Sequence, residues 1–342
     1  MTRNRTVVIS KRGGPNVLKL VEEALPEPGD GTVRVKVAAC GVAFADVLMR
    51  EGLYPGVPKP PFAPGYDVVG TVDAIGPSVA GLAVGQRVVA LTKIGGYADY
   101  TCVPATSLVP APEGVDDAEA VALVLNFLTA YQMIHRCARL RAGERVLIHG
   151  AGGGVGDALL QLGKLAGLEM YGTASRKKHE AIAKLGAVPI DYRDEDFVAR
   201  IAQLTGDGVD AVFDPVGGKQ WQRSFDCLRV GGMLIGYGFS SATVKGRRSL
   251  PKAAANWLGM PRFQLLRLMD ATRSVMGYNV TIMKAARPEW YREDLASLLA
   301  LLADGKIRPL VAERIPLAEA ARAHQLLDDA AVAGKLVLLC GA

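Results

Sequence analysis

The stretch of sequence that decides the fold is Val146-Leu147-Ile148-His149-Gly150-Ala151-Gly152-Gly153-Gly154-Val155-Gly156. An apolar strand runs directly into four glycines within five residues, and a helical pattern follows. Read from Ala151, the segment is A-x-G-G-V-G, a variant of the dinucleotide fingerprint. Small residues let the backbone approach a pyrophosphate and let the helix pack on the strand, while N–H groups at the helix start face the phosphates. The predicted cofactor-binding residues are Ala151, Gly153, Gly154, Val155 and Gly156.

The residues after the second predicted strand, Leu168–Ser175, indicate which cofactor is bound. Helical spacing over Val155–Ala166 predicts the intervening helix. A cofactor with a free ribose 2′-OH usually meets an Asp or Glu at the end of this strand, but here the sequence is Ser175-Arg176-Lys177-Lys178. Cations there would pair with a 2′-phosphate, which predicts NADPH in preference to NADH, with Ser175, Arg176 and Lys178 in the site. The alternative is a solvated helix start, although cations there oppose the helix dipole.

Strand and helix patterns continue to alternate along the chain. The further predicted strands are Val188–Asp191, Val209–Val216, Gly232–Gly238 and Val275–Val280, and the predicted helices are Phe197–Leu204 and Trp221–Leu228. Short turns between them predict an α/β fold with a doubly wound parallel sheet. Ligands of such sheets bind at the carboxyl ends of the strands, where Ser175, Asp214 and Gly236-Tyr237-Gly238 fall.

The first part of the chain has a different sequence pattern from the rest. The length of 342 residues suits two domains. Val33, Val35 and Val37 alternate with charged residues as in a half-buried strand, and Gly and Pro punctuate short segments. This pattern predicts a β-rich domain, with a helix at Ala43–Arg50. The helix predicted at Leu317–Asp328 and the strand at Lys335–Cys340 are not needed by the dinucleotide fold, so we expect them to return to the first domain.

Composition narrows the class of protein. Half of the residues are apolar, which is ample for large cores, and no apolar run reaches transmembrane length, so no membrane insertion and no signal peptide are expected. The net charge of +6 is spread out, and the cluster Lys245, Arg247, Arg248 and Lys252 is too small to indicate nucleic acid. Five scattered cysteines without a C-x-x-C pair disfavour a disulfide framework and a zinc knuckle and fit a cytoplasmic protein. The four histidines have no metal-ligand spacing.

Further segments match the pattern of a known family. They are Gly41-Val42-Ala43-Phe44-Ala45-Asp46, Gly52-Leu53-Tyr54-Pro55-Gly56, Pro64-Gly65-Tyr66-Asp67-Val68-Val69-Gly70, Leu128-Thr129-Ala130-Tyr131 and Ile190-Asp191-Tyr192-Arg193. With the glycine loop, they resemble the medium-chain dehydrogenase/reductase superfamily, and most closely its zinc-free quinone oxidoreductases, related to zeta-crystallin. The resemblance implies a GroES-like catalytic domain (1–126 and 286–342), a Rossmann NADPH-binding domain (127–285), an active cleft between them, and a homodimer.

The resemblance also bears on metal dependence. Zinc alcohol dehydrogenases of this superfamily have a Cys where Ala43 stands and His-Glu where Tyr66-Asp67 stands, and their four-cysteine lobe is replaced here by Thr92–Tyr97. Ala and Tyr are not plausible replacement ligands. Without a Lewis acid, simple alcohol oxidation is not expected. The expected reaction is hydride transfer from NADPH to a quinone or an α,β-unsaturated carbonyl, followed by a proton.

Three residues are expected to be catalytic from the resemblance. Tyr54 is the leading candidate, because the matching Tyr of the family faces the nicotinamide and could donate a proton or a hydrogen bond. Tyr66 is expected to line the pocket, and Asp46 to be a polar pocket group. The alternatives are a turn Tyr packed beside Pro55, a core aromatic residue and a structural carboxylate, respectively.

Five more residues are expected to bind the cofactor. Thr129 resembles the family residue near the nicotinamide carboxamide, and Tyr192 resembles one beside the adenosine phosphate. Gly238 and Phe239 lie at the carboxyl end of a predicted strand, where the backbone meets the nicotinamide end. Lys335 matches a common family lysine near the cofactor, and its alternative is a solvated strand residue.

Two departures from the compact quinone reductases keep other functions open. Ala43 replaces the usual Asn, which leaves a more apolar pocket. The segment Thr243–Arg273 forms an apolar insert, similar to the branch with the synaptic vesicle membrane protein VAT homologues; it could cap the cleft, pack in the core or make a dimer contact. The alternative functions are an enoyl reductase for a natural-product intermediate, or a low-turnover NADPH-binding protein associated with lipid or RNA.

Overall fold

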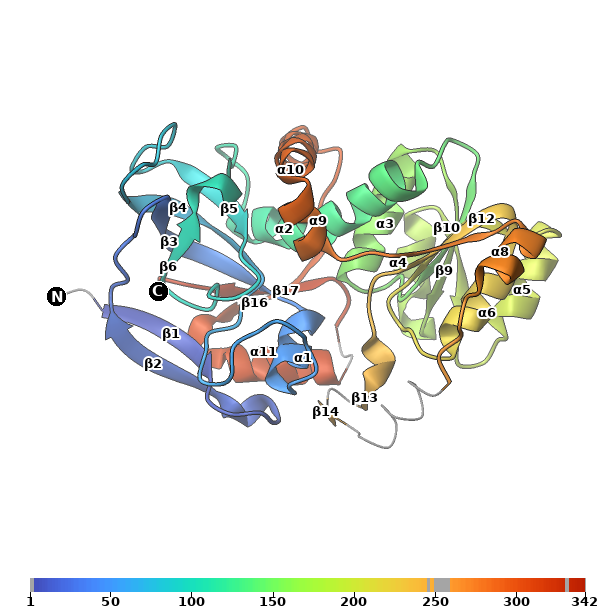
Figure 1. Ribbon diagram of the computed structural model, residues 1–342, viewed down its shortest axis with the longest axis horizontal. Coiled ribbons are helices and arrows are strands. Elements are labelled where there is room, and N and C mark those ends of the chain that lie inside the picture. The colour runs from blue at the N-terminus through green and yellow to red at the C-terminus, as the bar shows by residue number, and fades with distance from the viewer. Residues whose placement is uncertain (1–2, 245–246, 249–258, 330–331, 342) are drawn as a thin grey trace. The chain divides into compact units, whose positions relative to one another are not determined.

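A computed structural model describes residues 3–244, 247–248, 259–329 and 332–341 (Figure 1). The chain divides into two compact units. Unit 1 consists of Met1–Leu128, Lys245–Arg247 and Thr281–Ala342, and unit 2 of Thr129–Val244 and Arg248–Val280. Both ends of the chain therefore contribute to unit 1. Lys245 and Lys252 of the basic cluster lie outside the described residues, as do residues 249–258 of the insert.

Unit 2 is built on a six-stranded sheet in which every pairing is parallel. The strands are β8 (Arg145–His149), β9 (Glu169–Ala174), β10 (Ala187–Asp191), β11 (Val209–Asp214), β12 (Leu228–Gly236) and β15 (Ser274–Gly277). Their spatial order is β10-β9-β8-β11-β12-β15, so the chain starts in the middle and winds outward in both directions. This confirms the predicted doubly wound parallel sheet and places its switch point between β8 and β11.

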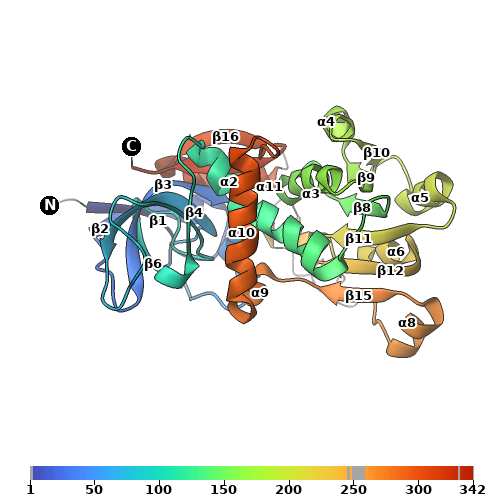
Figure 2. The same ribbon diagram turned by 90° about the horizontal axis from the view of Figure 1, so that it is seen from above.

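Helices cover both faces of this sheet. They are α3 (Gly154–Leu165), α4 (His179–Lys184), α5 (Phe197–Thr205), α6 (Gln220–Asp226) and α8 (Leu265–Ala271). Figure 2 shows α3 on one face and α5 and α6 on the other. Phe197 of α5 and Phe225 of α6 pack with Leu147 of β8 in one buried cluster. The strands are apolar on both faces because both are covered, as is typical of parallel sheets.

The predicted boundaries in unit 2 need three corrections. β12 begins at Leu228, not at Gly232, and the predicted helix Trp221–Leu228 ends at Asp226. Gly231 has a positive φ of 84°, and the β11–β12 register shifts between Val209 and Ala211, so this part of the strand lacks a regular apolar pattern. The predicted strand Val275–Val280 is also too long, since β15 ends at Gly277 and a helix begins at Val280.

Unit 1 contains a seven-stranded sheet and a hairpin. The hairpin is β1 (Arg3–Ile9) with β2 (Leu18–Ala24). The sheet holds β3 (Thr32–Val42), β4 (Asp67–Ile75), β5 (Arg87–Leu91), β6 (Tyr100–Pro104), β7 (Leu108–Pro110), β16 (Val311–Pro316) and β17 (Lys335–Leu339). Its order is β16-β17-β3-β4-β5-β7, with β6 also paired to β3. β17 pairs antiparallel with β3, with Leu338 opposite Cys40, so the C-terminal strand joins the first domain as expected.

The helices of unit 1 surround this sheet. They are α1 (Phe44–Arg50), α9 (Val280–Ala286), α10 (Pro288–Ala303) and α11 (Ala320–Asp328), and α2 (Asp117–Tyr131) begins in this unit. The predicted helix Leu317–Asp328 is a 3-10 turn, Leu317–Glu319, followed by α11. The remaining short elements are η1 (Pro15–Val17), η2 (Ala105–Ser107), the π-helical turn η3 (Gln132–Ala138), η4 (Arg176–Lys178), η5 (Ser240–Ala242), β13 (Thr243–Val244) and β14 (Arg247–Arg248).

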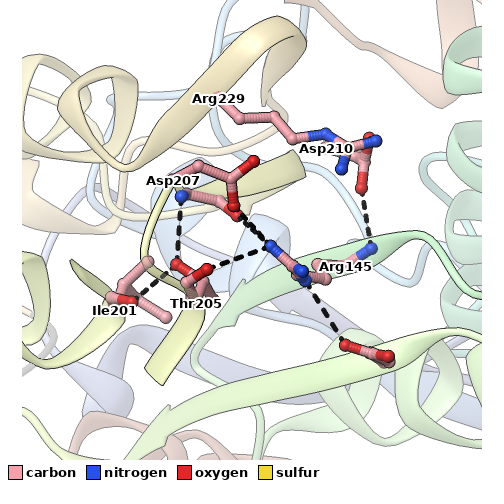
Figure 3. A network of polar contacts seen from close by, with 8 residues as sticks. Arg145, Ile201, Thr205, Asp207, Asp210 and Arg229 are labelled. Atoms are coloured by element: carbon pink, nitrogen blue, oxygen red, sulfur yellow. Dashed lines mark hydrogen bonds and ion pairs between the residues drawn. The ribbon is translucent and has the colours of Figure 1, made fainter. Parts of the chain in front are cut away.

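A polar network around Arg145 ties together the starts of the strands in unit 2 (Figure 3). The Arg145 guanidinium lies 2.5 Å from the Asp207 carboxylate and 3.5 Å from that of Glu169, which begins β9. Its backbone N–H donates to Asp210 of β11, and Asp210 also pairs with Arg229 of β12 at 2.5 Å. These contacts fix the edge of the sheet opposite to the carboxyl ends of its strands, which are the ends that bind ligands in such folds.

Among the described residues, no helix combines the length and the apolarity that crossing a bilayer requires.

Candidate functional site

The glycine loop has the close packing that a pyrophosphate cradle needs. Gly150 directly follows β8 and has a φ of +66°, and Gly153 is the N-cap of α3. A Cβ on Gly156 would lie 2.6 Å from Ala151 Cα and closer still to the Gly150 carbonyl oxygen, so the helix can approach the strand only because residue 156 is glycine. The first N–H groups of α3 have no acceptor within the helix and are available to an anion.

Ala151, at the first fingerprint position, packs against the neighbouring strand. Its N–H donates to the Thr173 carbonyl at 3.1 Å, and a Cβ on Gly172 would lie 2.8 Å from Ala151 Cβ. A methyl group is thus accommodated where the fingerprint usually has glycine, because β9 presents a glycine opposite it. The loop geometry of this chain therefore fits a dinucleotide despite the altered motif.

Lys178 connects the turn after β9 to the glycine loop. Its Nζ donates to the Gly152 carbonyl at 3.2 Å, and a Cβ on Gly152 would overlap the Lys178 side chain. Desolvation lowers the pKa of Lys178. Ser175, the N-cap of this turn, is half-buried, and Arg176 is exposed. The structure thus brings two predicted parts of the cofactor site together and leaves Arg176 accessible to a ligand.

A buried network joins the carboxyl ends of the central strands, and sequence reasoning missed it. Ser224 of α6 donates to Asp214 Oδ2 at 2.6 Å, and its oxygen lies 3.1 Å from His149 Nε2. His149 Nδ1 lies 3.0 Å from the Thr173 hydroxyl. Asp214 Oδ1 accepts the N–H groups of Val216 and Gly217. The only signal in the sequence was that His149 and Asp214 each end a strand.

The protonation of this network follows from its donors. Because the single Ser224 proton goes to the carboxylate, His149 Nε2 must donate to Ser224 and Nδ1 must accept from Thr173. Burial lowers the pKa of His149, in keeping with a neutral ring. All four side chains are buried, and Ser224 lies between Asp214 and His149, so the set shapes the ligand-binding edge and presents no exposed nucleophile.

The remaining predicted cofactor residues of unit 2 have different surroundings. Gly238 lies against Pro215, where a Cβ would be 2.7 Å from the carbonyl oxygen. The Phe239 ring lies 6.1 Å from that of Trp221. Thr129 is buried in α2, whereas Tyr192 is 53% exposed with the Arg193 guanidinium 5.7 Å from its ring centroid. Gly238 and Phe239 therefore lie beside the loop after β11, and Tyr192 lies in the turn after β10.

Three hydroxyl groups form a chain in unit 1. The Tyr54 and Tyr66 hydroxyls are 2.7 Å apart, and the Tyr66 hydroxyl lies 2.5 Å from Thr281 Oγ1. The two rings meet edge to face, with centroids 6.2 Å apart. Tyr66 is only 2% exposed, and burial raises its pKa well above the ordinary value. The structure brings the two predicted tyrosines together and adds Thr281, for which the sequence held no motif.

Asp46 is a buried capping residue. Its carboxylate accepts the N–H groups of Ala43 at 2.9 Å and of Gly65 at 3.1 Å, and the Tyr97 hydroxyl at 3.4 Å. Burial raises the pKa of Asp46 to about 7, partly offset by the Ala43 and Gly65 N–H groups and by the charge of Lys335. Through Gly65, Asp46 fixes the backbone next to Tyr66. Behind it, the Tyr97 hydroxyl lies 3.0 Å from His324 Nε2, and burial lowers the pKa of His324 to about 3.

Lys335 and Asp67 form a buried ion pair. Lys335 Nζ lies 3.0 Å from Asp67 Oδ2, which also accepts the Leu125 N–H at 3.2 Å. Both side chains are almost inaccessible to water. Gly41 makes room for them, because a Cβ there would overlap both. The lysine is therefore buried in the unit 1 sheet and is not a solvated strand residue.

Comparisons with known proteins identify the family. Residues 185–338 match the model described as zinc-binding dehydrogenase, and residues 29–113 match the alcohol dehydrogenase GroES-like domain. Mouse synaptic vesicle membrane protein VAT-1 homolog-like is 34% identical over 98% of this chain and 81% of its own length. Quinone oxidoreductase 1 of Escherichia coli (strain K12) is 33% identical over 96% of this chain and 97% of its own length. The crystal structure of Escherichia coli quinone oxidoreductase complexed with NADPH matches with a TM-score of 0.86 and 30% identity. The match covers 98% of this chain and 99% of that one.

The chain belongs to the medium-chain dehydrogenase/reductase superfamily, in its quinone oxidoreductase and VAT-1 branch. This confirms the resemblance expected from the motifs and the fold class, a GroES-like β domain with a Rossmann-like parallel sheet.

The residues present do not fit the zinc ion that the matched family model describes. Ala43 offers no donor atom, the Tyr66 hydroxyl is bonded to Tyr54 and Thr281, and Asp67 is paired with Lys335. Across the described part of the chain, no three His, Cys, Asp or Glu side chains gather where they could hold a metal. A tetrahedral zinc site needs three or four such ligands.

Proposed function

We propose that the chain is a zinc-independent, NADPH-dependent oxidoreductase that transfers hydride to a quinone or an α,β-unsaturated carbonyl. The observation that carries the proposal is the Tyr54–Tyr66 hydroxyl pair, 2.7 Å apart. By the resemblance, Tyr66 takes the position of a metal-ligand residue of the zinc enzymes, so the pair would supply a proton donor near the place where those enzymes hold a metal. An acceptor that is already electrophilic needs a proton or a hydrogen bond at its oxygen more than it needs a Lewis acid.

The cofactor is assigned to unit 2. The glycine loop at Ala151–Gly156 would hold the pyrophosphate, while Ser175, Arg176 and Lys178 would hold the 2′-phosphate. Similarity to the Escherichia coli quinone oxidoreductase, whose structure contains NADPH, supports this choice. When bound, the cofactor supplies the hydride.

The other cofactor contacts are proposed residue by residue. Tyr192 would contact the adenosine phosphate, and Thr129, Gly238 and Phe239 the nicotinamide end. Lys335 has three N–H donors, so its bond to Asp67 leaves donors for a cofactor oxygen.

The acceptor is assigned to the hydroxyl pair of unit 1. Tyr54 is half-buried and would bind the acceptor oxygen and give it a proton. Tyr66 is buried behind it and would orient the Tyr54 hydroxyl. Asp46 would act through Gly65 on the position of Tyr66, since its carboxylate accepts hydrogen bonds from the Ala43 and Gly65 N–H groups and from the Tyr97 hydroxyl.

Assembly and compartment form the last part of the proposal. We propose a cytoplasmic homodimer. β15 is the last strand of the six-stranded order, and Leu265, Leu266 and Met269 of α8 are exposed. Such an apolar surface beside a sheet edge is suited to pairing with a second copy. The five cysteines are all free thiols, as in a reducing compartment.

The experiment that tests the function compares NADPH with NADH oxidation across four acceptors: an ortho-quinone, a para-quinone, a simple enone and a medium-chain enoyl thioester. We expect NADPH-linked turnover of a quinone or the enone. Turnover of the thioester alone would favour an enoyl reductase instead. Tight NADPH binding without consumption would favour a low-turnover binding protein.

A further inference from the structure

The hydroxyl chain in unit 1 connects a half-buried tyrosine to a second half-buried residue through a buried one. Tyr54 follows α1, Tyr66 precedes β4, and Thr281 lies in the first turn of α9. The spacings are 2.7 Å and 2.5 Å. Of the three residues only the middle one, Tyr66, is buried, whereas Tyr54 and Thr281 are each partly exposed to solvent.

Each hydroxyl can donate one hydrogen bond and accept others, so the chain can be polarised in either direction. If Thr281 donates to Tyr66, then Tyr66 donates to Tyr54, and the Tyr54 proton is free for another acceptor. Reversing all three bonds points the proton toward Thr281. A chain with two such states moves a proton from one end to the other without moving a heavy atom.

Burial determines how the proton moves through the middle of the chain. An ionised Tyr66 would be a desolvated phenolate, and its pKa is raised accordingly. A stepwise path through a Tyr66 anion is therefore costly. Transfer along all three hydroxyls together leaves no charge on Tyr66 and avoids that cost.

The ammonium group of Lys93 lies beside the Tyr54 ring. Lys93 Nζ lies 5.8 Å from the centroid of the Tyr54 ring and donates to the Gly56 carbonyl at 2.7 Å. Thr92 and Lys93, which follow β5, donate their backbone N–H groups to the Tyr66 backbone carbonyl. Among the described residues, the Tyr66 hydroxyl bonds to the hydroxyls of Tyr54 and Thr281.

We propose that Thr281 is a positioning and proton-relay residue, the solvent end of a Thr281–Tyr66–Tyr54 relay that resupplies the proton given to the reduced acceptor. This rests on the proposed function. The acceptor gains two electrons with the hydride. The Tyr54 O–H bond breaks as a bond to that proton forms on the acceptor, the Tyr66 proton passes to Tyr54, the Thr281 proton passes to Tyr66, and water reprotonates Thr281. The net proton comes from solvent.

The test uses Thr281→Val, which keeps the shape and removes the hydroxyl, and Thr281→Ser, which restores it. Thr32→Val is the matched control, because the Thr32 hydroxyl bonds the Gly29 carbonyl elsewhere in the same unit. The first readout needs no cofactor. In protein labelled with ¹³Cζ-tyrosine and placed in mixed H₂O and D₂O, separate signals for O–H and O–D forms report how fast each tyrosine hydroxyl exchanges with water.

We expect Thr281→Val to slow exchange of the Tyr66 hydroxyl measurably, because only the route through Tyr54 then remains, and Thr281→Ser and Thr32→Val to match the wild type. The second readout is turnover with NADPH in H₂O and D₂O. Thr281→Val should lower kcat by about tenfold and change the solvent isotope effect, and it should leave the KM for NADPH unchanged. A proton-transfer group contributes about a hundredfold or more to catalysis, and the relay is expected to account for part of that factor. Thr281→Ser should restore the wild-type kcat and the wild-type solvent isotope effect.

Two results would overturn the relay. One is wild-type hydroxyl exchange and an unchanged isotope effect in Thr281→Val. The other is a loss in Thr281→Val that Thr281→Ser does not restore, which would mark a packing role. Failure of the proposed function is distinguishable, because it would appear as no NADPH consumption by the wild type with any acceptor, whatever the exchange rates show.

Discussion

The Ser224 hydroxyl donates to the Asp214 carboxylate at 2.6 Å and also contacts His149, so it links the ends of β11 and β8 at the carboxyl edge of the parallel sheet. With its one proton committed, Ser224 can only accept from His149, which sets the tautomer of that ring. His149 ends β8 directly before the glycine loop, and Asp214 ends β11 before the loop to Gly217. Two loops at the switch point are therefore held by one buried serine.

Replacing this serine should loosen both loops. Ser224→Ala leaves Asp214 Oδ2 and His149 Nε2 without their shared partner, so we expect the free energy of unfolding to fall by about 1–3 kcal/mol and the Kd for NADPH to rise. Denaturant unfolding and fluorescence titration measure the two effects. Ser297→Ala is the control, since the exposed Ser297 hydroxyl donates to the Glu293 carbonyl of its own helix, and a change of less than about 0.5 kcal/mol is expected. Equal losses in both variants would contradict the account.

Lys178 should distinguish the two nicotinamide cofactors. We expect Lys178→Met to raise the Kd for NADPH by about tenfold or more and to leave that for NADH nearly unchanged, because a charge-assisted bond to the 2′-phosphate is lost. Lys177→Met, in the same turn but exposed, should have a smaller effect. Equal weakening of NADPH and NADH binding by Lys178→Met would mean that the lysine serves only the loop carbonyl of Gly152.

Gly156 should tolerate no side chain. Gly156→Ala would place a Cβ within 2.6 Å of the Ala151 backbone, so the start of α3 must move away from the end of β8. We expect loss of measurable NADPH binding and a lower melting temperature. Gly29→Ala is the matched control, as nothing lies within 4 Å of a Cβ at that position. Wild-type binding by Gly156→Ala would remove the loop from the proposed cofactor site.

Stability should fall in acid because of buried histidine. The pKa of His324 in the folded protein is about 3, against 6.5 for an ordinary histidine, so the unfolded state binds the extra proton between these values. Its contribution is fully present above pH 6.5 and is lost as the pH falls toward 3. Asp46, with a pKa of about 7, acts in the opposite sense, because stability from this group declines as the pH rises from about 4 to 7.

Two variants separate these contributions. His324→Asn should flatten the fall in unfolding free energy below pH 6.5, with a remainder from His149, whose pKa is also lowered. Asp46→Asn should make the fall steeper. Chemical denaturation at a series of pH values gives both slopes, and a slope below pH 6.5 that is the same in His324→Asn and the wild type would contradict the assignment.

The parallel sheet was predictable because its strands are apolar on both faces and are punctuated by glycine and short helices. The start of β12 was missed, since Gly231 and Gly232 interrupt the apolar pattern. Tyr54 and Tyr66 were each predicted from the resemblance, but the contact between their hydroxyls was not. Ser224 and Thr281 are single hydroxyl residues on helices, and their partners are set by tertiary packing. Lys335 and Asp67 are 268 residues apart, so no local pattern could pair them.

The most direct test of the central claim is acceptor-dependent oxidation of NADPH by the wild type and Tyr54→Phe, with Tyr100→Phe as the control. We expect the wild type to consume NADPH with a quinone or an enone. Tyr54→Phe should lose about a hundredfold in kcat with an unchanged Kd for NADPH, and Tyr100→Phe should behave as the wild type. Undiminished turnover by Tyr54→Phe would contradict the assignment of the hydroxyl pair, and no turnover by the wild type with any acceptor would contradict the reductase itself.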